Sequence, residues 1–248
     1  MPEFDSDDVR LHYELAGPDD GPPIVLVHGF CSDYPLNWVG SRWQETLTRA
    51  GYLVLGLDCR GHGRSEKPHD PAAYARDVMA ADAVRLLDHL DIADAHVLGY
   101  SMGARIGLDL AVAHPDRVSR AVLGGLGRWD RGDRSDLIAR RMRGDDTVTD
   151  PVADMFYQFA AARPINDLEA LACCILAPQR APTDAELATV RVPVAVVVGD
   201  QDVIARGARD LAAGIAGARF VSLAGRNHMN AVPARLFKEA TLEFLAGP

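Results

Sequence analysis

Hydrophobic and polar positions along the chain follow two alternating patterns, one typical of strands and one typical of helices. Several of the strand-like runs are continuously apolar, which is typical of strands covered on both faces. The expected strands are Val9–Leu15, Ile24–Val27, Tyr52–Leu57, His96–Gly99, Val118–Leu123, Val192–Val198 and Arg219–Leu223. Between them lie helix-like segments, clearest in Ala72–Leu90, which follows the start signal Asp70-Pro71. This alternation predicts a mainly parallel sheet with helices on both faces.

The alternation stops between Leu126 and Thr189, where no strand-like run occurs. Short helical pieces separated by glycine and proline take its place. A segment of this length is too long for a plain loop in a compact domain. We therefore expect a helical cap at residues 127–189, inserted into a core formed by residues 1–126 and 190–248.

Composition narrows the classes of partner. The chain has 248 residues, of which 48% are hydrophobic, so a large core can be buried. The net charge of −9 disfavours nucleic acid and anionic membranes as partners. The densest basic stretch, Arg140, Arg141 and Arg143, is more typical of the solvent face of a helix.

Targeting signals and cofactor motifs are absent from the sequence. The first residues lack the pattern of a secretory signal, and no apolar run approaches the roughly 18 residues that cross a bilayer. The four cysteines, Cys31, Cys59, Cys173 and Cys174, match no zinc-binding spacing and are expected to be buried thiols. We therefore expect a cytoplasmic protein. Without a Walker motif, a dinucleotide fingerprint or a metal-ligand spacing, we expect no cofactor and no metal.

The strongest chemical signal is the sequence G-Y-S-M-G at Gly99–Gly103. It follows the expected strand His96–Gly99 and opens a helix that we expect to run from Met102 to about Ala113. A serine at such a strand-to-helix turn is held in a strained conformation that exposes its hydroxyl. Ser101 is therefore the candidate nucleophile, although a structural turn is the alternative.

A nucleophilic serine needs a base, and the base needs an orienting acid. His228 follows the last expected strand, on a loop at the carboxyl edge of the sheet, where catalytic groups of such sheets gather. Asp200 and Asp202 follow the strand Val192–Val198 at the same edge. We favour Asp202 as the orienting acid and expect Asp200 to brace the turn.

The loop after Ile24–Val27 carries the sequence H-G-F at residues 28–30. We expect the backbone N–H of Phe30, together with that of Met102, to form an oxyanion hole. His28 is a second histidine near the site, and we expect it to brace this loop rather than to take part in the reaction.

In order along the chain, these motifs resemble those of the α/β-hydrolase family. They are H-G-F at 28–30, D-C-R-G-H-G-R-S at 58–65, G-Y-S-M-G at 99–103, G-D-Q-D at 199–202 and G-R-N-H at 225–228. The resemblance implies an eight-stranded, mainly parallel α/β sheet, a helical cap and the triad of Ser101, Asp202 and His228. It also implies that Asp58, Arg60 and Gly61 brace a loop beside the site.

The chain departs from the family in ways that affect the reaction. Met229 follows the expected catalytic histidine where many relatives have an aromatic residue. Epoxide hydrolases and haloalkane dehalogenases of this family use an aspartate nucleophile, so Ser101 argues against both. We expect a carboxylesterase or lactonase whose partners are a small-molecule ester and water. The candidate substrate-binding residues are aromatic: Trp38, Trp129, Phe156 and Tyr157.

Two alternatives remain open. Arg105, four residues after the serine, also resembles a residue of the menaquinone-pathway lyase and of ring-fission hydrolases, which cleave carbon–carbon bonds of anionic substrates. That chemistry requires arginines of the cap to point inward. A different class of function is a small-molecule receptor that keeps the triad and turns over slowly.

Overall fold

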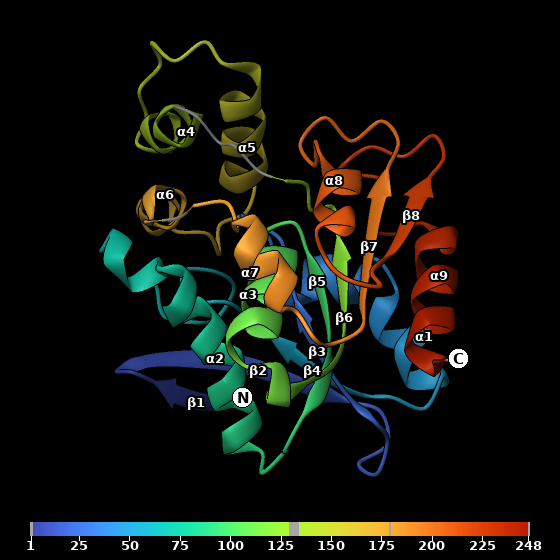
Figure 1. Cartoon of the computed structure of the whole chain (residues 1–248). Helices are drawn as coiled ribbons and strands as arrows, with labels where there is room; N and C mark the ends of the chain where they lie inside the picture. The colour runs from blue at the N-terminus through green and yellow to red at the C-terminus, as the bar shows by residue number, and fades with distance from the viewer. Residues whose placement is uncertain (1, 129–133, 179, 248) are drawn as a thin grey trace.

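The computed structural model describes residues 2–128, 134–178 and 180–247 (Figure 1). Within these ranges the strands form one eight-stranded sheet in the order β1-β2-β4-β3-β5-β6-β7-β8. The strands are β1 (Glu3–Ser6), β2 (Val9–Ala16), β3 (Pro23–Val27), β4 (Leu53–Leu57), β5 (Ala95–Tyr100), β6 (Val118–Gly124), β7 (Val194–Gly199) and β8 (Arg219–Leu223). β2 runs antiparallel to its neighbours, and the pairings from β4 to β8 are parallel. The predicted fold class is confirmed.

Each of the seven strands expected from the pattern is present, with ends within two residues of the prediction. The pattern alone missed β1, which has only four residues and forms a hairpin with β2. The two residues between them, Asp7 and Asp8, both have positive φ, at 48° and 61°. A two-residue turn of this kind suits the twist of a hairpin, and aspartate tolerates it better than most residues.

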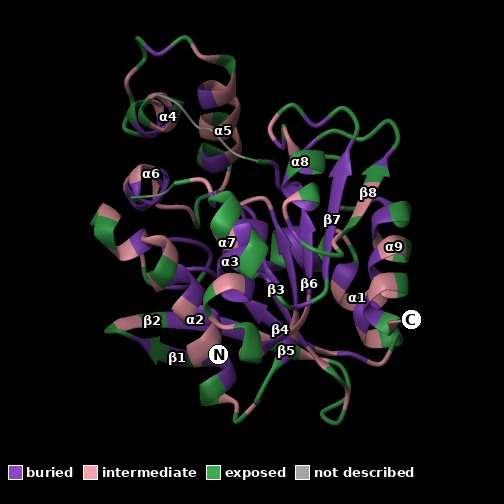
Figure 2. Cartoon of the chain, viewed as in Figure 1, coloured by how far each residue is buried: buried purple, intermediate pink, exposed green. Residues whose placement is uncertain are grey.

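Helices cover both faces of the sheet. They are α1 (Trp43–Arg49), α2 (Arg76–His89), α3 (Met102–Ala113), α4 (Arg134–Met142), α5 (Pro151–Ala161), α6 (Leu168–Leu176), α7 (Asp184–Thr189), α8 (Ala208–Ala213) and α9 (Arg235–Ala246). Along β3, Ile24 and Leu26 belong to the core shared with α1 and α9, whereas Val25 and Val27 belong to the core shared with α2 and α3. The central strands are therefore apolar on both sides, and Figure 2 shows them buried.

The helix expected at Ala72–Leu90 is divided in two. A short 3-10 helix occupies Pro71–Tyr74, and α2 begins only at Arg76. The carboxylate of Asp70 accepts a hydrogen bond from the N–H of Ala72, so the start signal caps the short helix and not α2. Ala75 has an extended backbone, with ψ at 153°, which separates the two helices.

Helices α4, α5, α6 and α7 connect β6 to β7 in the segment expected to form the cap. α4 packs against α5 and α6, and α6 also contacts the 3-10 helix Pro71–Tyr74. Figure 1 shows α4 and α5 standing away from the sheet, whereas α7 lies beside α3. Residues 127 and 189 as domain boundaries stay a prediction.

Two further expectations concern thiols and membranes. The cysteines are free and buried, as predicted. In the described part of the chain, the helices are too short or too polar to span a bilayer.

Candidate active site

Ser101 lies at the sharp turn between β5 and α3, with φ at 54° and ψ at −109°. Such a backbone is strained for any residue with a side chain, and it aims the hydroxyl away from the sheet. The flanking glycines permit the turn: a Cβ on Gly99 would lie 2.1 Å from the carbonyl oxygen of Gly103. A Cβ on Gly103 would lie 1.9 Å from the carbonyl oxygen of Val27. The motif therefore requires glycine at both positions for steric reasons.

Ser101 is linked to His228 and Asp202 by hydrogen bonds. Nε2 of His228 is 3.0 Å from Oγ of Ser101, and Nδ1 of His228 is 2.8 Å from Oδ2 of Asp202. A carboxylate only accepts hydrogen bonds, so Nδ1 carries the proton and Nε2 is left to accept the serine hydroxyl proton. The other oxygen of Asp202 accepts the N–H groups of Ile204 and Ala205, each at 2.9 Å. The structure thus brings together the three residues expected to form a triad.

Asp200 lies outside this chain of hydrogen bonds. Its carboxylate accepts the N–H of Gly225 at 2.8 Å and so ties the turn after β7 to the loop that carries His228. This is the bracing position expected from the sequence.

The loop that carries His228 is held by residues that the sequence analysis did not single out. Oδ1 of Asn227 accepts the N–H groups of Met229 and Asn230, and Oδ1 of Asn230 accepts the N–H of Asn227. The hydroxyl of Tyr100 donates to the carbonyl oxygen of His228. Asparagine pairs that close a turn are recognisable from sequence, whereas the Tyr100 contact joins residues 128 apart.

The loop with Phe30 runs beside Ser101. A Cβ on Gly29 would lie 3.7 Å from Cβ of Ser101, and the N–H of Gly29 donates to Oδ1 of Asn37 at 3.1 Å. In the described part of the chain, neither the N–H of Phe30 nor that of Met102 donates to a protein acceptor. Met102 begins α3, where the helix dipole favours negative charge. Neither N–H group is therefore committed to a protein acceptor.

The buried imidazole of His28 holds the same loop through two backbone contacts. Its Nδ1 lies 2.8 Å from the carbonyl oxygen of Gly29, and its Nε2 lies 3.0 Å from the backbone nitrogen of Cys59. The carbonyl accepts and the amide donates, so this imidazole must be neutral. Burial lowers the pKa of His28, although the nearby Asp58 carboxylate opposes this effect. Burial, together with neighbouring His28, lowers the pKa of His62 to about 3.

The residues expected to brace the adjacent loop do so. Asp58 accepts the N–H groups of Tyr34 and Arg64 at 2.8 and 2.9 Å. Arg60 is buried and donates to both oxygens of Asp82. Gly61 has φ at 78°, in the region that favours glycine.

Two cavities meet at Ser101. We call the first, of about 260 Å³, the arginine-lined chamber; its wall includes Met102, Arg105 and Arg206. We call the second, of about 370 Å³, the apolar chamber; its wall includes His228 and Met229. Phe30, Ser101 and Phe156 line both cavities. The rings of Phe30 and Phe156 contact each other edge to face, with centroids 5.5 Å apart.

Of the aromatic residues expected to bind substrate, Phe156 lies in the wall of both cavities. The prediction for Trp38 is wrong: its side chain is fully buried and packs edge to face on Trp43, in the core shared with α1 and α9. Tyr157 is not among the described residues that line these two cavities, and its ring packs against the guanidinium of Arg141, 4.0 Å from the ring centroid, so its role in substrate binding stays a prediction. Trp129 lies outside the described residues.

That contact also bears on the basic stretch of α4. Arg140 in α4 and Arg143 just after its end are exposed, as expected for a solvent face, whereas Arg141 is only partly exposed.

Comparison with known proteins identifies the fold. The family model described as "alpha/beta hydrolase fold" matches residues 22–134. A hydrolase from Pseudomonas aeruginosa PA01 superposes with a TM-score of 0.84 at 27% identity, over 99% of this chain and 98% of that one. The chain has the α/β-hydrolase fold. The enol-lactonase from Burkholderia xenovorans LB400 also superposes with a TM-score of 0.84, at 29% identity, over 99% and 100% of the two chains.

A curated relative shows how far the sequence similarity extends. The haloalkane dehalogenase of Mycolicibacterium paratuberculosis (strain ATCC BAA-968 / K-10) is 37% identical over 119 residues, which are 48% of this chain and 38% of that protein. The chain thus matches less than half the length of this dehalogenase, and the similarity alone does not assign a reaction.

Proposed function

We propose that this α/β-hydrolase is a serine-dependent hydrolase that cleaves a carboxylic ester or lactone of a small molecule. The observation that carries the proposal is the unbroken chain of hydrogen bonds from Asp202 through His228 to Ser101. Ester cleavage is supported further by the two N–H groups of Phe30 and Met102 beside the serine. A serine at this turn also distinguishes the chain from enzymes of the fold that use aspartate.

In the proposed mechanism, Oγ of Ser101 attacks the carbonyl carbon while Nε2 of His228 takes the hydroxyl proton. The N–H groups of Phe30 and Met102 stabilise the oxyanion of the tetrahedral intermediate. His228 then donates its proton to the departing alkoxide, which leaves an acyl group on Ser101. Water attacks this acyl-enzyme, gives its proton to His228 and releases the acid, and the proton returns to Oγ.

The carboxylate of Asp202 keeps the proton of His228 on Nδ1 and stabilises the imidazolium that forms in each half-reaction. Its own fixed position comes from the N–H groups of Ile204 and Ala205. Since the Asp202 side chain is fully buried, little solvent competes for these contacts.

A series of p-nitrophenyl esters of increasing acyl length tests the proposal. We expect hydrolysis of at least the short esters, and a loss of about 10⁴–10⁶ in kcat for Ser101→Ala with the fold intact. A Ser101→Ala variant that keeps most of the activity would refute the assignment of the nucleophile.

Lactones should also be assayed as substrates, because the enol-lactonase of known structure resembles this chain over its whole length. Carbon–carbon cleavage is the second candidate, favoured by the arginines in the wall of one chamber. Turnover of a ring-fission product without turnover of esters or lactones would select it. Tight binding of a small molecule without Ser101-dependent turnover would instead indicate a receptor.

A further inference from the structure

The positions of the two chambers assign the two halves of an ester. His228 lines the apolar chamber and is not among the described residues that line the other, whereas Ser101 lines both. In the proposed mechanism the leaving oxygen takes its proton from Nε2 of His228, so it must lie within hydrogen-bond reach of that atom. The alcohol half of the ester therefore occupies the apolar chamber. The acyl half, which stays bonded to Oγ, extends into the arginine-lined chamber.

The chambers differ in charge. Five of the described residues that line the acyl side are arginine and one is acidic: Arg76, Arg105, Arg128, Arg134, Arg206 and Asp109. None of the described residues lining the apolar chamber is Asp, Glu, Lys or Arg. This accumulation of positive charge occurs in a chain whose net charge is −9.

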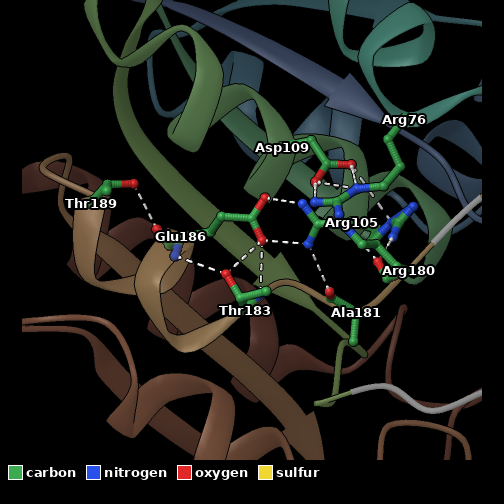
Figure 3. Close-up of polar contacts among 8 residues, drawn as sticks. All are labelled: Arg76, Arg105, Asp109, Arg180, Ala181, Thr183, Glu186 and Thr189. Atoms are coloured by element: carbon green, nitrogen blue, oxygen red, sulfur yellow. Dashed lines mark hydrogen bonds and ion pairs between the residues drawn. The ribbon is translucent and has the colours of Figure 1, made fainter.

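Two arginines of the arginine-lined chamber, Arg76 and Arg105, converge on Asp109 and on the carbonyl oxygen of Arg180 (Figure 3). The side chain of Arg105 is only 7% exposed, so two guanidinium groups and one carboxylate share a nearly dry site. Burial lowers the pKa of Arg105 to about 10, against the opposing effect of Asp109. The guanidinium therefore stays charged at neutral pH.

Three further arginines that line this chamber are exposed to solvent. Arg128 pairs with Asp184, and Arg134 lies 3.5 Å from Asp150. In the described part of the chain, the guanidinium of Arg206 makes no ion pair and no hydrogen bond with protein. Arg206 is thus the arginine of this wall best able to pair with an incoming anion.

The apolar chamber differs from this charged wall, because large apolar side chains that line it are exposed to solvent. Leu36 and Met229 are 39% and 48% exposed there, although large apolar side chains are normally covered. Met155, Phe159 and Val232 continue this apolar wall. An uncharged alcohol of aromatic or branched aliphatic type is the complementary ligand.

We propose that the substrates are amphipathic half-esters, with an anionic group at the far end of the acyl part and an apolar alcohol. This inference rests on the proposed ester hydrolysis and names its substrate class. Arg206 binds the anion directly, and the other arginines of the chamber favour it through their field.

Three esters of matched size test this assignment. Benzyl hydrogen glutarate carries a carboxylate on its acyl part, 4-carboxybenzyl pentanoate carries one on its alcohol part, and benzyl pentanoate carries none. We expect kcat/KM to be about tenfold higher for the glutarate than for the neutral ester, and lowest for the ester with its carboxylate on the alcohol. Raising the salt concentration should reduce the preference for the glutarate, since exposed charges are screened.

Charge variants assign the preference to the chamber. Arg206→Gln should reduce the ratio of kcat/KM for the glutarate to that for the pentanoate several-fold, and Arg206→Glu should reverse it. Arg209→Gln is the matched control, because Arg209 is an exposed arginine three residues away that packs on the ring of Phe220. It should leave the ratio unchanged.

The outcomes separate this inference from the function on which it rests. Hydrolysis that depends on Ser101 but prefers the neutral ester, or an Arg206→Glu variant with an unaltered ratio, would overturn the half-ester assignment and leave the hydrolase intact. Preference for the carboxylate on the alcohol would show that the two chambers have been assigned the wrong way round. Failure of Ser101-dependent turnover with all three esters would overturn both proposals.

Discussion

The hydroxyl of Tyr100 donates a hydrogen bond of 2.5 Å to the backbone carbonyl oxygen of His228. Tyr100 is the residue before the candidate nucleophile, and its ring also lies 5.3 Å from the imidazole of His228, between centroids. The strand that positions the serine is therefore attached directly to the loop that positions the base. We expect this contact to help align Ser101 with His228.

Removal of that hydroxyl should weaken alignment without unfolding the protein. A net hydrogen bond contributes about 0.5–1.5 kcal/mol, so we expect Tyr100→Phe to lose up to about tenfold in kcat with KM little changed. Steady-state kinetics on a p-nitrophenyl ester measure this split. A variant with unaltered kcat would show that the Asn227 and Asn230 turn is sufficient to hold the base.

The two aspartates at the end of β7 should differ in their effects. We expect Asp202→Asn to lose about 10²–10⁴ in kcat, because the amide no longer fixes the His228 tautomer or stabilises the imidazolium. Asp200→Asn is the matched control at the same turn and should change mainly the free energy of unfolding. Kinetics and urea unfolding of both variants separate the roles, and the opposite pattern would assign the orienting function to Asp200.

Phe156 and Tyr157 are adjacent on α5 but differ in their surroundings. Phe156 lines both chambers, so Phe156→Ala should enlarge the site and shift the preferred acyl length and KM of the ester series. Tyr157→Ala should leave acyl preference unchanged, since Tyr157 packs against Arg141. Equal shifts in the two variants would indicate that α5 acts through its stability and not through a side chain in the cavity wall.

Acid should destabilise the fold through its buried neutral histidines. The pKa of His62 is lowered from 6.5 to about 3 in the folded protein, chiefly by burial. Between these values the unfolded state binds more protons, so stability is full above pH 6.5 and is lost as the pH falls toward 3, by about 1.4 kcal/mol per pH unit. The free energy of unfolding in urea should be measured from pH 7 to 5 for the parent protein and for His62→Phe. The parent's value minus the variant's value should fall with this slope as the pH is lowered. A difference that is constant with pH would contradict it.

The sequence predicted those features that depend on local pattern and on motif order. Continuous apolar runs located the parallel strands, and the glycines around Ser101 predicted the turn because close backbone approach permits no other residue. β1 escaped the pattern analysis because four residues with one large apolar side chain carry little periodic signal. The prediction for Trp38 failed because the π-helical turn at Pro35–Val39, which the sequence pattern does not reveal, directs the Trp38 side chain into the core.

Long-range contacts within the site could not be predicted from the sequence. Asn37 supports Gly29, and Tyr100 supports His228, yet neither side chain belongs to a recognisable spacing. The division of the site into two chambers likewise depends on where α5 places Phe156 against Phe30. The arginines of one chamber come from α2, α3, α4 and two loops, so no single stretch of sequence displays them together.

The most direct test of the triad is covalent labelling with an organophosphate, followed by peptide mapping by mass spectrometry. A serine hydroxyl activated by His228 reacts with such a reagent, whereas an ordinary serine does not. We predict a single adduct on Ser101, complete loss of ester hydrolysis in proportion to labelling, and no adduct in His228→Gln. Loss of activity with the adduct on another residue, or full activity with Ser101 labelled, would contradict the account.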